Sequence, residues 1–342
     1  MEKTAMKVGH IPSLTWNRLE ANEGTAPAGL AASLDVETRF EKLPEGVTRR
    51  RMSGKEAAKW LEKYAPEEKA EAIVAGKMPI YHPQRFGTGL GAEYDAFLEK
   101  SGTVYEMLEV APDTRCEEPV VWSVDFYDGN EASQGQLIRV GENSHLTLLL
   151  RAASGSKEKG TAAFSTKIIL EKGASLFLVK AQILGEGYTF LDDTGAALAE
   201  DASMKMVQIE LGGGRVYIGT QPELIGDRSS FEAHAGYLGN DRKEIDVNYN
   251  AIQRGRRTNV KMSFDGVLKD RSEKAFRGTI DFRKGSKGSK GDEQENVLLL
   301  SDDVVNKTLP IILCEEEDVE GRHGASIGQL DDDILFYICL LY

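Results

Sequence analysis

The sequence is poor in cysteine and histidine, and it lacks any long apolar segment. Its 342 residues include three cysteines, Cys116, Cys314 and Cys339, and five histidines. The cysteines form no CxxC pair, and their wide spacing matches neither a zinc site nor a disulfide framework. No stretch approaches roughly eighteen consecutive apolar residues, and the N-terminus has no apolar signal region. We therefore expect a soluble, cytoplasmic protein in a reducing compartment, with no membrane partner.

Basic residues are outnumbered by acidic ones. The chain has 42 lysines and arginines against 55 aspartates and glutamates, a net charge of −13. This charge opposes non-specific binding to phosphate backbones, so nucleic acid is excluded as an expected partner. The GxSxG nucleophile motif and the Walker A loop are both missing. We expect neither a hydrolase triad nor ATP hydrolysis by this chain alone.

Residues 1–115 are predicted to form an irregular and α-helical N-terminal domain. Ser53 and Glu56 have the spacing of a capping box at the start of a helix. Further helices are expected over 66–76 and 92–102. The segment FGTGLGAEY, residues 86–94, resembles a phosphate-binding glycine loop, but no buried strand precedes it. A turn between helices is the simpler interpretation.

From residue 116 the pattern changes to short apolar alternations, such as HLTLLLRAA and SLFLVKAQI, separated by Gly, Asp or Asn. The residues that open these runs are separated by 30, 28, 27, 29, 37 and 27 positions: Ser144, Ala174, Ala202, Ser229, Thr258, Glu295 and Arg322. The long interval contains RKGSKGSKG, residues 283–291, which we interpret as a loop insertion. A period of this length without helical crossovers predicts a mainly β protein with a parallel β-helix over 116–338, and a β-sandwich is the alternative.

Two residues near the C-terminus are candidate metal ligands. The period aligns His323 with His145, at a corner where a strand begins. The ordinary interpretation of a polar residue at such a position is an exposed corner residue. Cys314 ends the apolar run LPIILC and is either a buried small hydrophobe or a thiolate ligand. Imidazole and thiolate suit iron, zinc or copper, but two groups are too few for a closed site. A metal site here must be completed by another subunit or by exogenous sulfide.

The C-terminal part of the chain contains a series of short elements: F-x-G-x-I from Phe276, Q-x-N-x-L-L-L-S over Gln294 to Ser301, the Pro310 segment, the Asp318–Val319 pair and H-G-A-S-x-G over His323 to Gly328. In these elements, residues 276–338 resemble the SufB/SufD family of iron-sulfur cluster assembly scaffolds, and the SufD-type branch most. The resemblance extends to TWNRLEAN, residues 15–22.

The resemblance implies a right-handed parallel β-helix preceded by a helical N-terminal domain. It also implies a non-catalytic scaffold subunit of the SUF machinery. A SufB-like and a SufD-like protein, or two copies of one chain, pair through their β-helices, and SufC-type ABC ATPases attach. Nascent iron-sulfur clusters form transiently at the paired interface. In the SufD-like partner, the histidine of the H-G-A element is implicated in this interface site, and His323 matches that histidine. Gly321 stands where family members often have a cysteine. In the family a C-terminal helical domain docks the SufC ATPase, and in this sequence only a stub, residues 339–342, stands in its place. Among the partners that the resemblance implies, SufC is therefore the least expected.

A polysaccharide-active parallel β-helix lyase or hydrolase is the alternative function. It requires a catalytic base and acids that converge on the outer face of adjacent coils, with calcium dependence in a lyase. The missing signal region disfavours it, since polymeric substrates are mostly extracellular.

Overall fold

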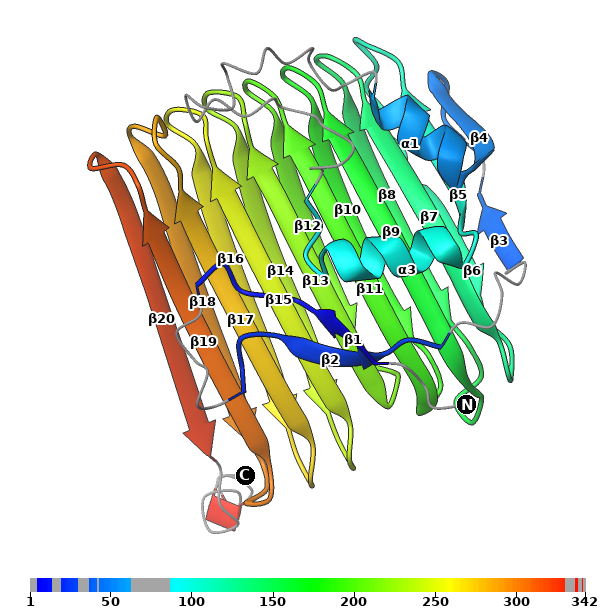
Figure 1. Ribbon diagram of the computed structural model, residues 1–342, viewed down its shortest axis with the longest axis vertical. Helices are drawn as coiled ribbons and strands as arrows, with labels where there is room; N and C mark the ends of the chain where they lie inside the picture. The colour runs from blue at the N-terminus through cyan, green and yellow to red at the C-terminus, as the bar shows by residue number, and fades with distance from the viewer. Residues whose placement is uncertain are drawn as a thin grey trace.

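The computed structural model describes residues 5–13, 20–29, 37–41, 43–62, 87–329, 336–337 and 340. These residues form a parallel β-solenoid, in which two nine-stranded sheets face each other (Figure 1). From β5 (Val104–Val110) onward, successive strands alternate between the sheets, so each coil contributes one strand to each. The predicted parallel β-helix is confirmed, with two strands per coil.

We call the two sheets sheet I and sheet II. Sheet I consists of β3 (Glu37–Phe40), β6 (Val120–Asp125), β8 (His145–Ala153), β10 (Ser175–Ile183), β12 (Ser203–Glu210), β14 (Ser230–Gly239), β16 (Asn259–Leu268), β18 (Ser289–Leu299) and β20 (Val319–Gln329). Sheet II consists of β4 (Val47–Ser53), β5 (Val104–Val110), β7 (Glu131–Val140), β9 (Lys159–Leu170), β11 (Gly187–Leu198), β13 (Arg215–Leu224), β15 (Glu244–Gln253), β17 (Glu273–Phe282) and β19 (Val305–Cys314). Within the described parts of these two sheets, β3 and β4 alone pair antiparallel to their neighbours, and both sheets extend N-terminal of residue 116.

Alternating side chains build the core between the two sheets. In β8, for example, Leu146, Leu148 and Leu150 point inward and are buried, while the residues between them are half-buried on the outer face. The corners between strands carry a left-handed residue, such as Asn143, Gly173 or Asp201. Asn, Asp and Gly adopt this conformation at the lowest cost, which explains the punctuation seen in the sequence.

The register of the last coils differs from the predicted period. Thr258 lies beside Ser289, to which its backbone N–H donates a hydrogen bond at 3.0 Å, and Ser289 pairs with Val319. The intervals are therefore 31 and 30 residues, and the predicted alignment with Glu295 and Arg322 is wrong. The glycine-lysine-serine run is no insertion, because its last residues begin β18.

The N-terminal segment covers the outer face of sheet II. It contains the hairpin of β1 (Ala5–Val8) and β2 (Gly24–Pro27) and two short helices, α1 (Gly54–Glu62) and α3 (Ala92–Lys100). The capping box of α1 and the helix expected over 92–102 are confirmed. The helix expected over 66–76 lies outside the described residues. The helical content of this segment is minor, since strands account for much of its described part.

Polar contacts hold this segment on the sheet. Arg277, 1% exposed, donates to both carboxylate oxygens of Asp246 at 2.7 Å and to the Ala21 carbonyl at 2.8 Å. The glycine-rich stretch before α3 is docked in the same way, because Asn248 donates to the Gly89 carbonyl at 2.7 Å. A Cβ atom at position 89 would lie 1.9 Å from the backbone nitrogen of Thr220. The glycine therefore permits close packing on the sheet.

Charged side chains also lie inside the solenoid. Lys180 contacts the Asp192 carboxylate and donates to Thr194 at 2.9 Å. Gln208 donates to Asp192 and to Glu210, each at 3.0 Å. Burial, with a smaller contribution from Asp192, raises the pKa of Glu210 to about 8. The interior of the central coils is therefore a hydrogen-bonded polar network as well as an apolar core.

Candidate functional site

The C-terminal end of the solenoid is open among the described residues. β19 and β20 are the terminal strands of their sheets and form the last coil. The last coil covers the inward-facing residues of the coil before it. Among the described residues, no further coil covers the inward-facing residues of the last coil. Ile327, which pairs with the buried Val297, is 52% exposed for this reason. The end of the fold thus presents the inner lining of a coil to solvent.

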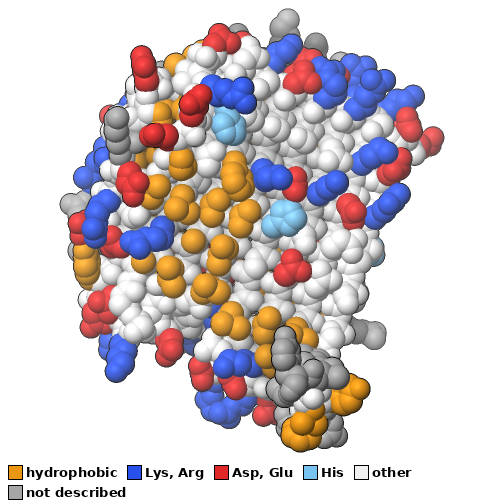
Figure 2. All heavy atoms as spheres, turned by 180° about the vertical axis from the view of Figure 1, so that it is seen from behind, with side chains coloured by type: hydrophobic (Ala, Val, Ile, Leu, Met, Phe, Trp, Pro, Cys, Tyr) orange, Lys and Arg blue, Asp and Glu red, His pale blue; other side chains and the backbone are white. Residues whose placement is uncertain are grey.

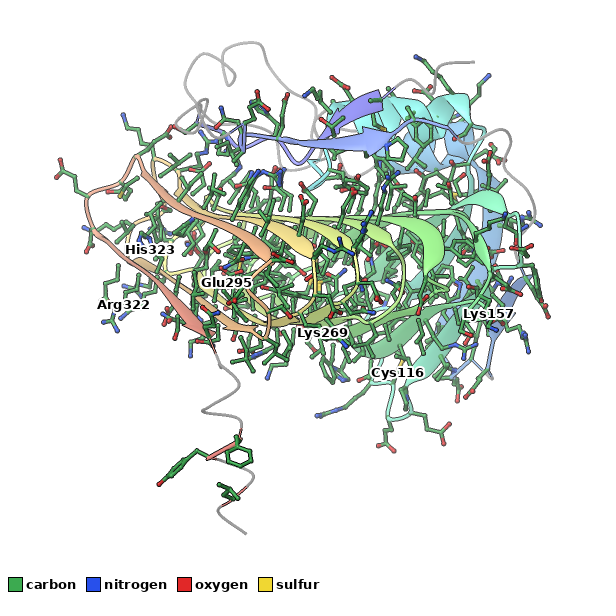
Figure 3. The ribbon with its side chains drawn as sticks, turned by 90° about the horizontal axis from the view of Figure 1, so that it is seen from below. Cys116, Lys157, Lys269, Glu295, Arg322 and His323 are labelled. Atoms are coloured by element: carbon green, nitrogen blue, oxygen red, sulfur yellow. The ribbon has the colours of Figure 1, made fainter. Side chains whose placement is uncertain are left out.

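His323 lies in the middle of β20 and belongs to this lining. Its register partner on β18 is Glu293, which is buried and inward-facing. His323 therefore lies on the inner side of the last coil, where it is exposed, while Arg322 lies on the outer side (Figure 3). The predicted corner position is wrong, because the slot of His145 is occupied in the last coil by Glu320.

Cys314 ends β19 and is exposed. Its thiol donates to the backbone carbonyl of Glu316 at 3.1 Å. Its register partner Phe282 is fully buried in the preceding coil, but no further coil covers Cys314. The interpretation of Cys314 as a buried core thiol is therefore wrong. The apolar residues around Cys314 in the sequence are typical of a position that faces the inside of a coil. The side chain is exposed because β19 belongs to the last coil.

The candidate ligands do not form a closed metal site within the part of the chain that is described. No group of three or more His, Cys, Asp or Glu side chains there is arranged to hold a metal ion. His323 is on sheet I and Cys314 on sheet II. Gly321 faces the same interior as His323, because a Cβ atom there would lie 3.2 Å from the side chains of Ile312 and Phe282. A thiol at position 321 would thus share the inner side of the last coil with His323.

A buried ion pair lies beneath the open end. The Lys274 ammonium contacts the Glu295 carboxylate, and their side chains are 0% and 1% exposed. Thr308 accepts a hydrogen bond from Lys274 at 3.0 Å and donates one to Glu295 at 2.7 Å. Tyr237 donates a further hydrogen bond to Glu295 at 3.1 Å. This group joins β14, β17 and β18 to β19 of the last coil.

Glu293 is a second inward-facing carboxyl of β18. Burial, together with the nearby Glu295, raises the pKa of Glu293 to about 8. Gly278 leaves room for it, since a Cβ atom there would lie 2.3 Å from both carboxylate oxygens. Sequence analysis missed Lys274, Glu293 and Glu295 as interior residues. The sequence signal that could have found them is the alternation of inward and outward positions along β17 and β18, because these three charged residues occupy inward positions.

The acidic run 315–318 forms the corner between β19 and β20. Glu316 accepts hydrogen bonds from the backbone N–H groups of Gly285 and Glu317, both at 3.0 Å. Arg283 lies 3.3 Å from Glu315. These contacts fasten the last corner to the preceding one, a structural role for the acidic run.

No helix among the described residues has the length and apolar character needed to span a membrane.

Comparisons with known proteins agree with the geometry. A family model described as "SUF system FeS cluster assembly, SufBD core domain" matches residues 127–339. The chain is 24% identical over 236 residues to "Iron-sulfur cluster assembly protein SufD" of Bacillus subtilis (strain 168), covering 68% of this chain and 54% of that protein. It thus spans about half the length of that relative.

Two further relatives carry related names. An "Iron-sulfur cluster assembly SufBD family protein" of Antithamnion sp. is 23% identical over 240 residues, covering 67% of this chain and 80% of that protein. The SufD protein of Escherichia coli (strain K12) is 24% identical over 141 residues, covering 41% of this chain and 33% of that protein. These matches favour a role in iron-sulfur cluster assembly over the alternative prediction, a polysaccharide-active enzyme.

Proposed function

This chain belongs to the SufBD core family of the SUF iron-sulfur cluster assembly system, and we propose that it serves there as a non-catalytic scaffold subunit. In this role it pairs with a SufB-like protein, or with a second copy of itself, through the open last coil. Nascent clusters are assembled transiently at the paired interface. The iron and sulfide are cargo, and the chain itself performs no covalent step.

The open last coil is the observation that supports this proposal. β19 and β20 leave one side of their backbones without a strand partner among the described residues, and such edges readily pair with another chain. Ile327 supplies exposed apolar surface beside them. A partner that continues the two sheets would bury both features and enclose His323.

His323 is the proposed ligand from this chain. A neutral imidazole suits iron, and the inner side of the last coil directs the side chain toward the space that a docked partner would close. The partner supplies thiolate and sulfide, because the described residues offer no closed ligand set. Cys314 is a weaker candidate, since it lies at the end of β19 in the other sheet.

SufC-type ATPases complete the proposed assembly in the cytoplasm. Their ATP-driven motion would open or reshape the interface, which couples conformational change to cluster assembly without chemistry by this chain.

The substitution Ile327→Asp tests the pairing surface. It places a charge on the exposed lining of β20, so we expect loss of co-purification with the SufB-like partner and an unchanged thermal unfolding midpoint. Lys261→Ala, on the outer face of sheet I, is the matched control and should retain the partner. Unchanged co-purification of the Ile327→Asp variant would refute pairing through the last coil.

A further inference from the structure

The outer face of sheet I carries an apolar surface that no described residue covers. Sheet II bears apolar residues on its outer face too, but there the N-terminal segment buries them; Tyr94 and Leu98 of α3, for example, pack with Leu191. On sheet I the outward positions of β10 and β12 include Phe177, Val179 and others. Figure 2 shows hydrophobic side chains gathered over one half of this face and charged ones over the other half.

One row of this surface runs across the ends of the strands. Its members occupy equivalent positions in successive coils: Ala153, Ile183, Leu211, Leu238, Val267 and Leu298. Ile183 and Leu211 are 51% and 49% exposed. The next position in the row is Gly328, one residue before the end of β20. The row therefore leads from the central coils to the point where the chain leaves the solenoid.

The chain that follows β20 is itself apolar. Residues 330–342 read LDDDILFYICLLY, with nine consecutive apolar residues after three aspartates. The described side chains there, Phe336, Tyr337 and Leu340, are 67%, 64% and 63% exposed. In Figure 2 the hydrophobic side chains of the face continue toward this C-terminal end. Two exposed apolar surfaces of one chain thus meet at a single place.

We propose that the segment 334–342 docks along this apolar row on the outer face of sheet I of its own chain. The row from Leu298 to Ile183 crosses four strand spacings, about 19 Å, and nine extended residues span about 30 Å. The segment therefore reaches the row in either an extended or a partly helical form.

The corners that the segment would pass carry charges of both signs. Lys269, Asp270 and Arg271 form the corner after β16. Asp302 and Asp303 lie in the corner after β18, where Gln329 at the end of β20 donates a hydrogen bond to Asp302 at 2.6 Å. The placement therefore rests on the apolar row and on the reach of the segment, not on charge. The inference is independent of the cluster-assembly role, because it concerns the face away from His323.

Disulfide trapping with the native Cys339 tests this docking. The variant L211C, in a C314S background, places a thiol in the row, while S263C places one on the outer face of β16, nearer to β20. Under mild oxidation of the full chain, docking raises the local thiol concentration at position 211. We expect an intramolecular cross-link to Cys339 in at least about ten-fold higher yield for L211C than for S263C.

A second pair of substitutions separates docking from chance contact. F336D with L340D should abolish the cross-link of the L211C variant, while circular dichroism and the melting temperature confirm that each variant is folded. Equal yields for L211C and S263C, or no cross-link in either, would overturn the proposal. Purely intermolecular cross-links would also overturn it, because the segment would then occupy the face of a second copy.

Discussion

Replacing Lys274 with methionine should destabilise the solenoid beneath its open end. The substitution removes the cation that contacts Glu295 while it keeps the length and apolar stem of the side chain. From the described residues, Glu295 then retains the hydrogen bonds of Thr308 and Tyr237, and the buried carboxyl of Glu293 lies nearby. A buried carboxylate without its cation is the most costly consequence of this change.

The magnitude follows from the burial of the pair. Breaking a buried ion pair by removing one partner costs about 3–5 kcal/mol. The side chains of Lys274 and Glu295 are 0% and 1% exposed, so we expect the Lys274→Met variant to lose about 3–5 kcal/mol of unfolding free energy at pH 7.

Urea unfolding at pH 7, followed by circular dichroism, measures this loss. The double variant Lys274→Met with Glu295→Leu should recover most of the stability, since it leaves no unpaired charge. Lys290→Ala removes an exposed ion pair with Glu320 between β18 and β20 and should leave the midpoint unchanged. A loss below about 1 kcal/mol at pH 7 would refute the reasoning.

Three further predictions concern other parts of the fold. The fold raises the pKa of Glu210 from an ordinary 4.5 to about 8, so Glu210 binds its proton more tightly in the folded protein. In urea titrations between pH 4.5 and 8, the stability of the wild type relative to Glu210→Gln should therefore fall by up to about 1.4 kcal/mol per pH unit. A difference in stability that does not change with pH would contradict this. Arg277→Ala leaves Asp246 buried without its cation and should expose the N-terminal segment to limited proteolysis, whereas an unchanged cleavage pattern would show that the segment is held otherwise. Gly89→Val should displace the stretch before α3, because its Cβ would meet Thr220; undiminished amide protection there would argue against close docking.

Local patterns in the sequence predicted the repeating part of the fold. Alternation in segments such as HLTLLLRAA correctly predicted strands with one buried side, and the recurring corners predicted a solenoid. The capping box at Ser53 and Glu56 was also correct, because both partners are within one helical turn. These features depend on residues close together in the sequence.

Features that depend on distant contacts were not predicted. The last two coils were aligned on Glu295 and Arg322, because the lysine-rich corner resembled an insertion, whereas the pairing of Thr258 with Ser289 fixes the register. The docking of the N-terminal segment rests on contacts such as Arg277 with Ala21, which are 256 positions apart. The family resemblance singled out His323, but only the register shows that it faces the interior of an open coil.

The most direct test of the account is the iron and acid-labile sulfide content of the complex co-purified with the SufB-like partner. His323→Ala should keep the partner, because the strand edges are unchanged, and should lose most of the bound iron and sulfide. Arg322→Ala, its outward-facing neighbour on β20, should retain both. Wild-type iron and sulfide in the His323→Ala complex would contradict the claim that the last coil of this scaffold presents a cluster ligand.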